Sequence, residues 1–393
     1  MKAVITESIH QVFDRMDPFF QAPHNHRWFV EHDQYIPDYA VLHQMGIRTR
    51  DRYMNGSIHA MSNALWYRWV WPRLMGPVQR LLLEVPVPNR HAEYDQAFIA
   101  AIHSACHDRR FTLPHLSYTA LFDLFSQCSA QYYRVAYGID DTYAADKQQQ
   151  SMMAQDCYTR IYSEVKHSNH AFKRLVCMAA NANWMDSLEP QWRQKTEALC
   201  QAYIQDDLPF SHLAGCESTI ARMHATVPGK TILYECDNHG EVWFDCLLVE
   251  WLLDHGCSVI MTGKDQPVVN DVTASELQTV VAQIPALSAA KTAGRLQVIS
   301  TGACMTGRSI YTISDAYRVA YARADEVWVK GQGNFASTPM AHWRWGRLHW
   351  YRYRKPVVFL MVVKANLIQA SLNLLGMNRP KGAILVHRYE QGE

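Results

Sequence analysis

Two short segments of the chain pair an acidic side chain with a carboxamide, a combination that suits a hard divalent cation. Asp237 and Asn238 form the first pair, and Asn270 and Asp271 form the second. Carboxylate and amide oxygens are the ligands that Mg²⁺ and similar ions take from proteins. If the two pairs meet in space, they could hold one ion and leave positions open for water and a substrate oxygen.

The surrounding pattern places both pairs directly after predicted β-strands. Candidate strands lie at 231–236, 258–262, 296–301, 326–329, 356–363 and 383–387, and helical spacing separates most of them, at 242–254, 274–284 and 313–323. Short apolar strands that alternate with helices predict a mainly parallel sheet covered on both faces. We therefore expect both pairs at the carboxyl edge of the sheet, where open α/β proteins bind their ligands.

Two glycine-containing turns follow later strands. The turn at 301–307 includes Gly302 and could present backbone N–H groups to an anion, or could simply be a tight connection. In the next turn, Gly331 and Gly333 would let the backbone approach a ligand, and Lys330 would supply a positive charge for phosphate. Taken alone, such a turn is weak evidence for a site.

The first half of the chain has a different period. Residues 92–205 show apolar side chains at helical spacing throughout, whereas residues 1–60 are polar with weak periodicity. At 393 residues the chain suggests two domains, which we place at 1–205, all-helical, and 206–393, an α/β/α catalytic domain. Asn183 and Asp186 end an apolar helix and could point at one place, or could cap it.

Ordinary capping is the main alternative for the acidic residues. Asp237 alone could be the N-cap of the helix that follows it, and Glu241 could cap that helix or favour its dipole. Asp245, one turn further along, could orient a metal-bound water or Lys330. The recurrence of acid and amide after two strands, with a lysine-glycine turn after another, favours a metal site.

Composition excludes several function classes. The chain has 38 Lys and Arg against 37 Asp and Glu, so no net field attracts nucleic acid or an anionic membrane. The N-terminus lacks the features of a signal peptide, and no uncharged run is long enough to cross a bilayer, so we expect a cytoplasmic protein. The ten cysteines never form a C-x-x-C pair, and most are expected to be buried in a reducing compartment.

Three other features favour structural interpretations. His24 and His26 lack a third ligand for zinc and are expected to be surface or hydrogen-bonded residues. The aromatic stripe at 58–84 indicates core, or an interface between copies of the chain in a homo-oligomer. Asp140 and Asp141 are expected in a solvated turn.

Together the motifs resemble the metal-dependent damage-control phosphatase family, also called domain of unknown function 89, which includes proteins once described as acidic-residue methyltransferases. The resemblance rests on D-N-x-G-E at 237–241, N-D-V-T at 270–273 and K-G-Q-G-N at 330–334. Residues 182–186 are similar to the family's G-N-x-x-D segment, with alanine for glycine. The match covers about residues 170–390, and residues 1–160 resemble no member.

The resemblance implies a fold and a set of site residues. The fold would be a helical N-terminal part packed on a Rossmann-like α/β/α domain. One divalent cation, of Mn, Mg, Ni, Co or Fe, would be held by Asp237, the side-chain oxygen of Asn238, and Asp271. The pocket would also be lined by Asn183, Asp186, Asn270, Lys330, Asn334 and Lys364, the last of which looks like the family's lysine at that place.

These residues predict a metal-dependent phosphohydrolase that acts on a small phosphorylated metabolite, such as a sugar phosphate or a damaged cofactor intermediate. Asp237, Asn238 and Asp271 would hold the ion, while Lys330, the backbone at Gly331 and Gly333, and Lys364 would steady the phosphoryl oxygens. One alternative is recruitment to other metal-dependent chemistry, a lyase or cyclisation step in a specialised pathway. Another is an S-adenosylmethionine-dependent carboxyl methyltransferase, although the first turn lacks the glycines of such a site. A non-catalytic binding role is the remaining class.

Overall fold

The computed structural model describes the chain in two compact units. The described residues are 1–21, 87, 89–108, 118–166, 168, 170–186, 191–204, 215–308, 313–338, 341–344, 347–350, 355–364, 368–369, 372–373 and 377–389. The first unit comprises Met1–Thr142, Arg308–Thr312 and Ser337–Tyr351, and the second comprises Tyr143–Gly307, Ile313–Ala336 and Arg352–Glu393. The domain boundary expected at residue 205 falls inside the second unit. His24, His26 and the aromatic stripe at 58–84 lie outside the described residues.

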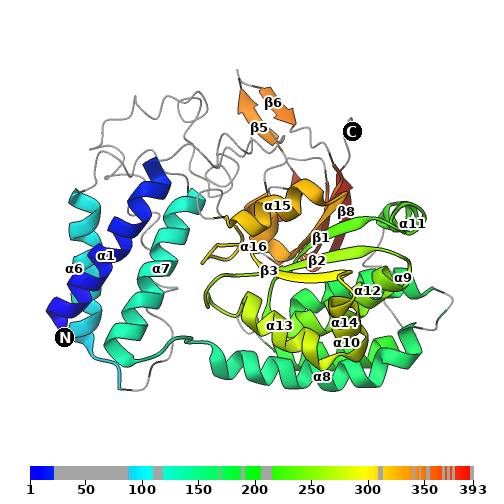
Figure 1. Ribbon diagram of the computed structural model, residues 1–393, viewed down its shortest axis with the longest axis horizontal. Helices are drawn as coiled ribbons and strands as arrows, with labels where there is room; N and C mark the ends of the chain where they lie inside the picture. The colour runs from blue at the N-terminus through cyan, green and yellow to red at the C-terminus, as the bar shows by residue number, and fades with distance from the viewer. Residues whose placement is uncertain are drawn as a thin grey trace. The chain divides into compact units, whose positions relative to one another are not determined.

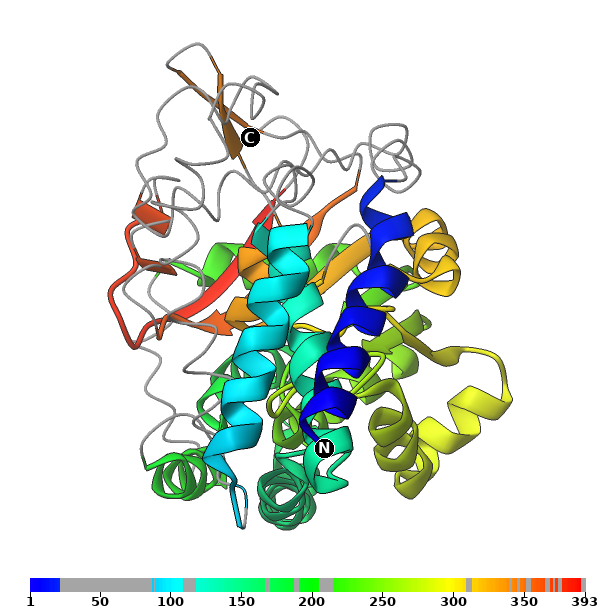
Figure 2. The same ribbon diagram turned by 90° about the vertical axis from the view of Figure 1, so that its left-hand side faces the viewer.

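The first unit contains the helices α1 (Lys2–Gln21), α6 (Ala92–Asp108) and α7 (Tyr118–Tyr137), with the antiparallel strands β5 (Ala341–Arg344) and β6 (Arg347–Trp350). Helix α1 packs on both other helices, as Figure 2 shows for α1 in blue and α6 in cyan. Residues 2–21 form a helix although the periodicity of residues 1–60 is weak. Ile5, Ile9 and Phe13 recur at helical spacing and are buried, so this helix is formed by tertiary packing.

The second unit is organised around a six-stranded sheet. Its strands are β1 (Thr231–Glu235), β2 (Ser258–Gly263), β3 (Leu296–Ser300), β4 (Glu326–Lys330), β7 (Val357–Val362) and β8 (Ile384–Tyr389). They lie in the order β3-β2-β1-β4-β7-β8, and every neighbouring pair is parallel except β7 with β8. This confirms the predicted α/β class with a mainly parallel sheet, and each of the six candidate strands is present.

Helices cover the sheet because its strands are apolar on both faces. They are α8 (Ala144–Lys166), α9 (Ala171–Asn181), α10 (Trp192–Ile204), α11 (Glu217–Thr226), α12 (Val242–Asp254), α13 (Ala274–Gln283), α14 (Pro285–Thr292), α15 (Asp315–Arg323) and α16 (Gly331–Ala336), with the 3₁₀ turns η4 (Ala182–Trp184) and η6 (His239–Glu241). Figure 1 shows α12 and α15 on opposite sides of the sheet.

The helices between residues 144 and 204 form an outer layer of this same unit. Helix α12 packs on β2 with one side and against α8 and α9 with the other, so all its residues from Val242 to Leu253 are buried. A helix with apolar residues around most of its circumference needs cover on every side. That need explains why helices expected in a separate domain lie over the sheet.

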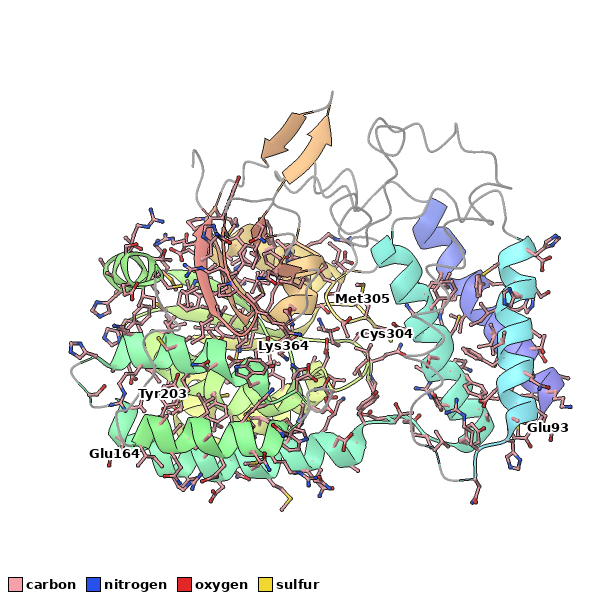
Figure 3. All side chains as sticks on the ribbon, turned by 180° about the vertical axis from the view of Figure 1, so that it is seen from behind. Glu93, Glu164, Tyr203, Cys304, Met305 and Lys364 are labelled. Atoms are coloured by element: carbon pink, nitrogen blue, oxygen red, sulfur yellow. A yellow bond between two sulfur atoms is a disulfide. The ribbon has the colours of Figure 1, made fainter. Side chains whose placement is uncertain are left out.

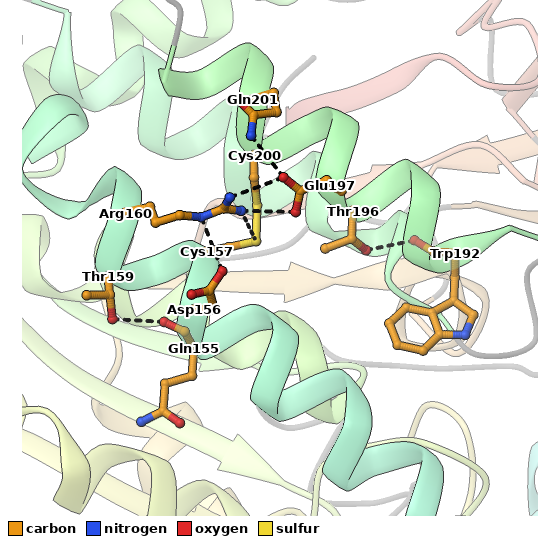
Figure 4. Close-up of a disulfide and its surroundings, with 10 residues drawn as sticks. All are labelled: Gln155, Asp156, Cys157, Thr159, Arg160, Trp192, Thr196, Glu197, Cys200 and Gln201. Carbon is orange, nitrogen blue, oxygen red and sulfur yellow. Dashed lines mark hydrogen bonds and ion pairs between the residues drawn. A yellow bond between two sulfur atoms is a disulfide. The ribbon is translucent and has the colours of Figure 1, made fainter.

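Eight of the ten cysteines are buried and belong to no disulfide, and burial was expected for most of them. The other two, Cys157 and Cys200, form a disulfide that joins α8 to α10 (Figure 4). The Arg160 guanidinium lies beside it, 3.4 Å from the Cys157 sulfur, and donates to both carboxylate oxygens of Glu197. A reducing, cytoplasmic location stays a prediction.

No helix among the described residues has the length and apolarity needed to cross a bilayer. Asp140 belongs to an exposed turn, where its carboxylate pairs with Arg134 at 2.8 Å. This agrees with the solvated turn expected there.

Candidate active site

The backbone brings the two acid–amide pairs together at the carboxyl edge of the sheet. Asn238 and Asp271 form an isolated antiparallel bridge. The His239 N–H donates to the Asn270 carbonyl, and the Val272 N–H donates to the Asp237 carbonyl, both at 2.9 Å. The two segments lie after the neighbouring parallel strands β1 and β2, which explains why they meet.

A cavity of about 140 Å³ opens at this edge, between the strand ends. Eight residues predicted for the site line it, namely Asn183, Asp186, Asp237, Asn238, Asn270, Asp271, Gly333 and Lys364. Val269, Thr306 and Gln332 also line it, and sequence reasoning did not single them out. Val269 has a φ of 48°, a left-handed conformation that is unusual for a β-branched residue and is common at functional sites.

The two aspartates carry charge that is almost removed from water. Asp237 is 6% exposed and Asp271 is 2% exposed. Burial raises the pKa of Asp237 well above its usual range, and repulsion from Glu241 and Asp271 adds to this effect. Burial raises the pKa of Asp271 to about 6, although Lys264 opposes the change. In the described structure, the Oδ2 atom of Asp271 accepts no hydrogen bond.

Two carboxamides fix the first aspartate and its neighbours. Asn183 Nδ2 donates to Asp237 Oδ2 at 3.0 Å and to Glu241 Oε1 at 2.8 Å. Asn238 Nδ2 donates to the same Glu241 oxygen at 2.5 Å. The amide nitrogen of Asn238 is therefore engaged, which leaves its side-chain oxygen as the atom available to a cation.

The capping alternatives do not describe these residues. Asn238, not Asp237, stands at the N-cap position of η6, and its side chain makes no capping hydrogen bond. Glu241 makes no capping hydrogen bond to α12 and instead accepts from both carboxamides.

Gly331 allows the Asp237 carboxylate to lie against the backbone after β4. Its φ is 71°, and a Cβ built there would lie 1.7 Å from Asp237 Oδ2. The close approach predicted for this glycine is therefore an approach to a site side chain. Gly331 itself does not line the cavity.

Lys330 lies beneath the cavity and not in it. The side chain is fully buried, and its Nζ contacts Glu241 Oε2 and Asp245 Oδ1 at 3.0 Å each and also donates to the Ala179 carbonyl. Burial opposes the charge, but Asp245 and Glu241 outweigh it and raise the pKa of Lys330. The expectation that Lys330 steadies phosphate is not met, because its donors are already taken.

Asp245 completes this buried cluster. It is fully buried, and burial raises the pKa of its carboxyl to about 6 although Lys330 acts in the opposite direction. Its Oδ1 atom also accepts from the Tyr234 hydroxyl at 2.7 Å. Of the two partners considered for Asp245, a metal water and Lys330, the structure provides the contact with Lys330.

Gly302 and Asn334 also lie outside the cavity lining. Asn334 Nδ2 donates to the carbonyls of Cys236 and Lys330 at 2.9 Å each, so it ties together the ends of β1 and β4. Gly302 has a φ of 84°, which fits the tight connection considered for its turn. Thr306, from the same turn, reaches the cavity instead.

Lys364, two residues after the end of β7, provides positive charge at the cavity (Figure 3). Its Nζ lies 2.9 Å from Asp186 Oδ2, and Asn270 Nδ2 donates to the other oxygen of Asp186 at 3.1 Å. Among the described lining residues, Lys364 is the sole cationic side chain. Asp186 therefore holds a lysine and a carboxamide in place at the cavity rim.

The predicted cation site consists of the carboxylates of Asp237 and Asp271 and the carboxamide of Asn238. In the described part of the chain, no three His, Cys, Asp or Glu side chains are grouped so that they alone could hold an ion. The site needs the oxygen of Asn238 as its third donor, which is compatible with the oxygen ligands of a hard cation.

Two curated relatives match part of the chain. The chain is 35% identical over 107 residues to the damage-control phosphatase PH1575 of Pyrococcus horikoshii. The aligned segment covers 27% of this chain and 34% of the relative. The chain is 31% identical over 108 residues to the uncharacterized protein MJ0202 of Methanocaldococcus jannaschii, covering 28% of this chain and 32% of that protein. The chain thus spans about a third of the length of these relatives.

The fold is similar to a solved structure. The crystal structure of the DUF89 family protein PH1575 from Pyrococcus horikoshii superposes with a TM-score of 0.53 at 21% sequence identity, covering 80% of this chain and 95% of that chain. At this identity the likeness establishes the fold.

The family model for the damage-control phosphatase ARMT1-like domain matches residues 71–375. The match begins about 100 residues before the resemblance expected from the motifs, which was placed at about residue 170, so it includes much of the helical part. The chain belongs to the family of damage-control phosphatase ARMT1-like domains.

Proposed function

We propose that this protein is a metal-dependent phosphohydrolase that acts on a small phosphorylated metabolite, such as a sugar phosphate or a damaged cofactor intermediate. The observation that carries the proposal is the pair of buried aspartates at one small cavity, one of which has an oxygen without a hydrogen-bond partner in the described structure. Membership of the phosphatase-like domain family and the name of the relative PH1575 agree with it.

The donor set fits a single divalent cation of Mn, Mg, Ni, Co or Fe. Burial and mutual repulsion destabilise the negative charges of Asp237 and Asp271. A bound cation would stabilise both charges. Asp237, the side-chain oxygen of Asn238, and Asp271 would hold it. When bound, such an ion supplies Lewis acidity and neutralises charge at a phosphoryl oxygen.

The remaining lining residues would orient the substrate. Lys364 is placed to contact a phosphate oxygen, and Gly333 borders the same cavity. A cavity of about 140 Å³ is smaller than typical pockets for drug-sized ligands. It therefore favours a phosphate group with a compact metabolite attached.

The buried residues beneath the cavity would keep this geometry rigid. Lys330 holds Glu241 and Asp245, and Glu241 in turn accepts from Asn183 and Asn238. A supporting layer of this kind fixes the side chains that contact an ion. We assign these three charged residues to support and the cavity-lining residues to substrate contact.

The test is hydrolysis of p-nitrophenyl phosphate and a panel of sugar phosphates by protein stripped with a chelator and then supplied with Mn²⁺, Ni²⁺ or Co²⁺. We expect metal-dependent phosphate release, and a loss of about 100-fold or more in Asp271→Asn, because one ligand of the ion is removed. Asp254→Asn, at the exposed end of α12, is the matched control and should keep full activity.

Four outcomes would contradict the proposal. Metal-independent hydrolysis, or equal activity of Asp271→Asn, would remove the role of the aspartates. Metal binding without hydrolysis of any phosphoester would favour a lyase or cyclisation reaction. Tight binding of S-adenosylmethionine without metal would favour the methyltransferase. The absence of nucleic-acid and membrane partners, and assembly into a homo-oligomer, stay predictions.

A further inference from the structure

A third lysine, Lys264, lies beside the cavity and has no part in the function proposed above. It directly follows β2, and only 1% of its surface is exposed. Its backbone N–H donates to the Val272 carbonyl at 2.8 Å, and its carbonyl accepts from the Ala274 N–H at 2.9 Å. These bonds hold the segment after Asp271 against the end of the strand and so keep the backbone of Lys264 close to that aspartate.

The ammonium group of Lys264 contacts three different parts of the site. Nζ donates to the Gly307 carbonyl at 2.6 Å and to Asn334 Oδ1 at 3.0 Å. It also lies 3.5 Å from Asp271 Oδ2, the oxygen that accepts no hydrogen bond in the described structure. The contact with Asp271 is therefore an attraction between charges, while the two hydrogen bonds go to the other partners.

The contact with Gly307 reaches the turn that lines the cavity. Thr306, the residue before it, borders the cavity. The same turn packs closely on Gly333, where an added Cβ would lie 3.1 Å from the Thr306 carbonyl carbon. One buried charge thus links a predicted metal ligand to the turn that carries Thr306.

We propose that Lys264 is a positioning residue with two opposing effects, since it weakens binding of the divalent cation at Asp271 and strengthens binding of phosphate by holding the 301–307 turn. This inference rests on the metal site of the proposed function. A fixed positive charge beside Asp271 repels an incoming cation. When no cation is bound, the same positive charge stabilises the buried carboxylate.

Direct binding measurements on the full chain can separate these effects. Lys264→Gln removes the charge and keeps a donor for Gly307, whereas Lys264→Arg keeps the charge. By titration calorimetry, we expect Lys264→Gln to bind Mn²⁺ about tenfold more tightly than the wild type. Lys264→Met, which has no donor for Gly307, should bind inorganic phosphate more weakly than the wild type when both are loaded with Mn²⁺. Lys264→Arg should bind Mn²⁺ with an affinity close to that of the wild type.

Lys230→Met is the matched control for the loss of a lysine from a buried ion pair. Lys230 precedes β1, at the opposite end of that strand from Asp237, and pairs with the fully buried Glu326. We expect this variant to change Mn²⁺ affinity much less than Lys264→Gln does. Lys264→Met should give the same tighter Mn²⁺ binding as Lys264→Gln, so a folding defect in one variant leaves the other to decide.

The outcomes distinguish this inference from the proposed function. A wild-type protein that retains no Mn²⁺ would overturn the metal site and this inference with it. If the wild type binds Mn²⁺ and both charge-removing variants bind it equally or more weakly, the inference fails and the metal site stands. A residue with only a structural role would weaken the binding of both ligands, whereas the proposed role changes them in opposite directions.

Discussion

Replacing Lys330 with methionine distinguishes a supporting lysine from a phosphate-binding one. In the structure, its ammonium group is the partner of Glu241 and Asp245, at 3.0 Å from each, and all three side chains are fully buried. Breaking a buried ion pair by removing one partner costs about 3–5 kcal/mol, because the other charge stays buried without compensation. For a unit of this size, that loss corresponds to a decrease of roughly 6–20 °C in the thermal midpoint.

The loss should also depend on pH. Without Lys330, the pKa of the Asp245 carboxyl in the folded protein would rise further above its unfolded value of about 4. A group with a raised folded pKa contributes fully to stability below its unfolded pKa, and that contribution is lost as the pH rises through the folded value. Asp245 titrates at about 6 even beside the lysine. The deficit of Lys330→Met should therefore be large near pH 8 and smaller near pH 5.

Thermal unfolding followed by circular dichroism at both pH values measures this effect. Lys381→Met, at an exposed turn residue, is the control and should unfold like the wild type at each pH. A phosphate-binding lysine would behave differently, since its loss would reduce hydrolysis and leave the midpoint unchanged. Unchanged unfolding of Lys330→Met with reduced phosphate affinity would therefore refute the supporting role.

Three further predictions follow from the same geometry. Gly331→Ala should lower Mn²⁺ affinity at least tenfold by calorimetry, because the new Cβ would displace the Asp237 carboxylate, and wild-type affinity would refute this. Mn²⁺ affinity should fall by about tenfold or more from pH 7 to pH 5, because protons compete with the ion for Asp271, whose pKa is about 6 without an ion. An affinity that does not change with pH would exclude Asp271 as a ligand. Replacing Cys157 and Cys200 with serine should lower the free energy of unfolding by about 2–4 kcal/mol, because the disulfide is lost. The thermal midpoint of the variant should lie below that of the oxidised wild type and equal that of the reduced wild type.

The sequence was sufficient to locate the strands and the residues that meet at their ends. Strand period and the acid–amide pairs predict this, because parallel strands deliver the turns that follow them to one edge. The direction of a side chain at that edge depends on distant partners. Lys330 follows the motif of a phosphate lysine, yet it donates to the carbonyl of Ala179, 151 residues away in sequence. No local pattern contains that contact.

The assignment of the helices to units failed for a similar reason. Helical period alone correctly indicates helices between 144 and 204, but it does not say what their apolar faces contact. In the structure, α12 is buried on all sides and needs α8 and α9 as cover. Residues 242–253 are apolar in the sequence except for Asp245 and Glu250, and a helix that is apolar on most sides already implies an outer layer.

The charges around the cavity give an independent reason to expect a divalent ion. Five carboxylates and three lysines form one connected group, whose formal charges sum to two negative charges. The members of this group are Asp186, Asp237, Glu241, Asp245, Asp271, Lys264, Lys330 and Lys364. Buried charge without compensation is costly and shifts carboxyl pKa values upward, as at Asp237 and Asp271. One divalent cation would balance the group. A monovalent cation would leave a negative charge at the aspartates. We therefore expect Mn²⁺ to raise the thermal midpoint of unfolding and K⁺ at equal concentration to leave it unchanged. Equal stabilisation by both ions would contradict this charge balance.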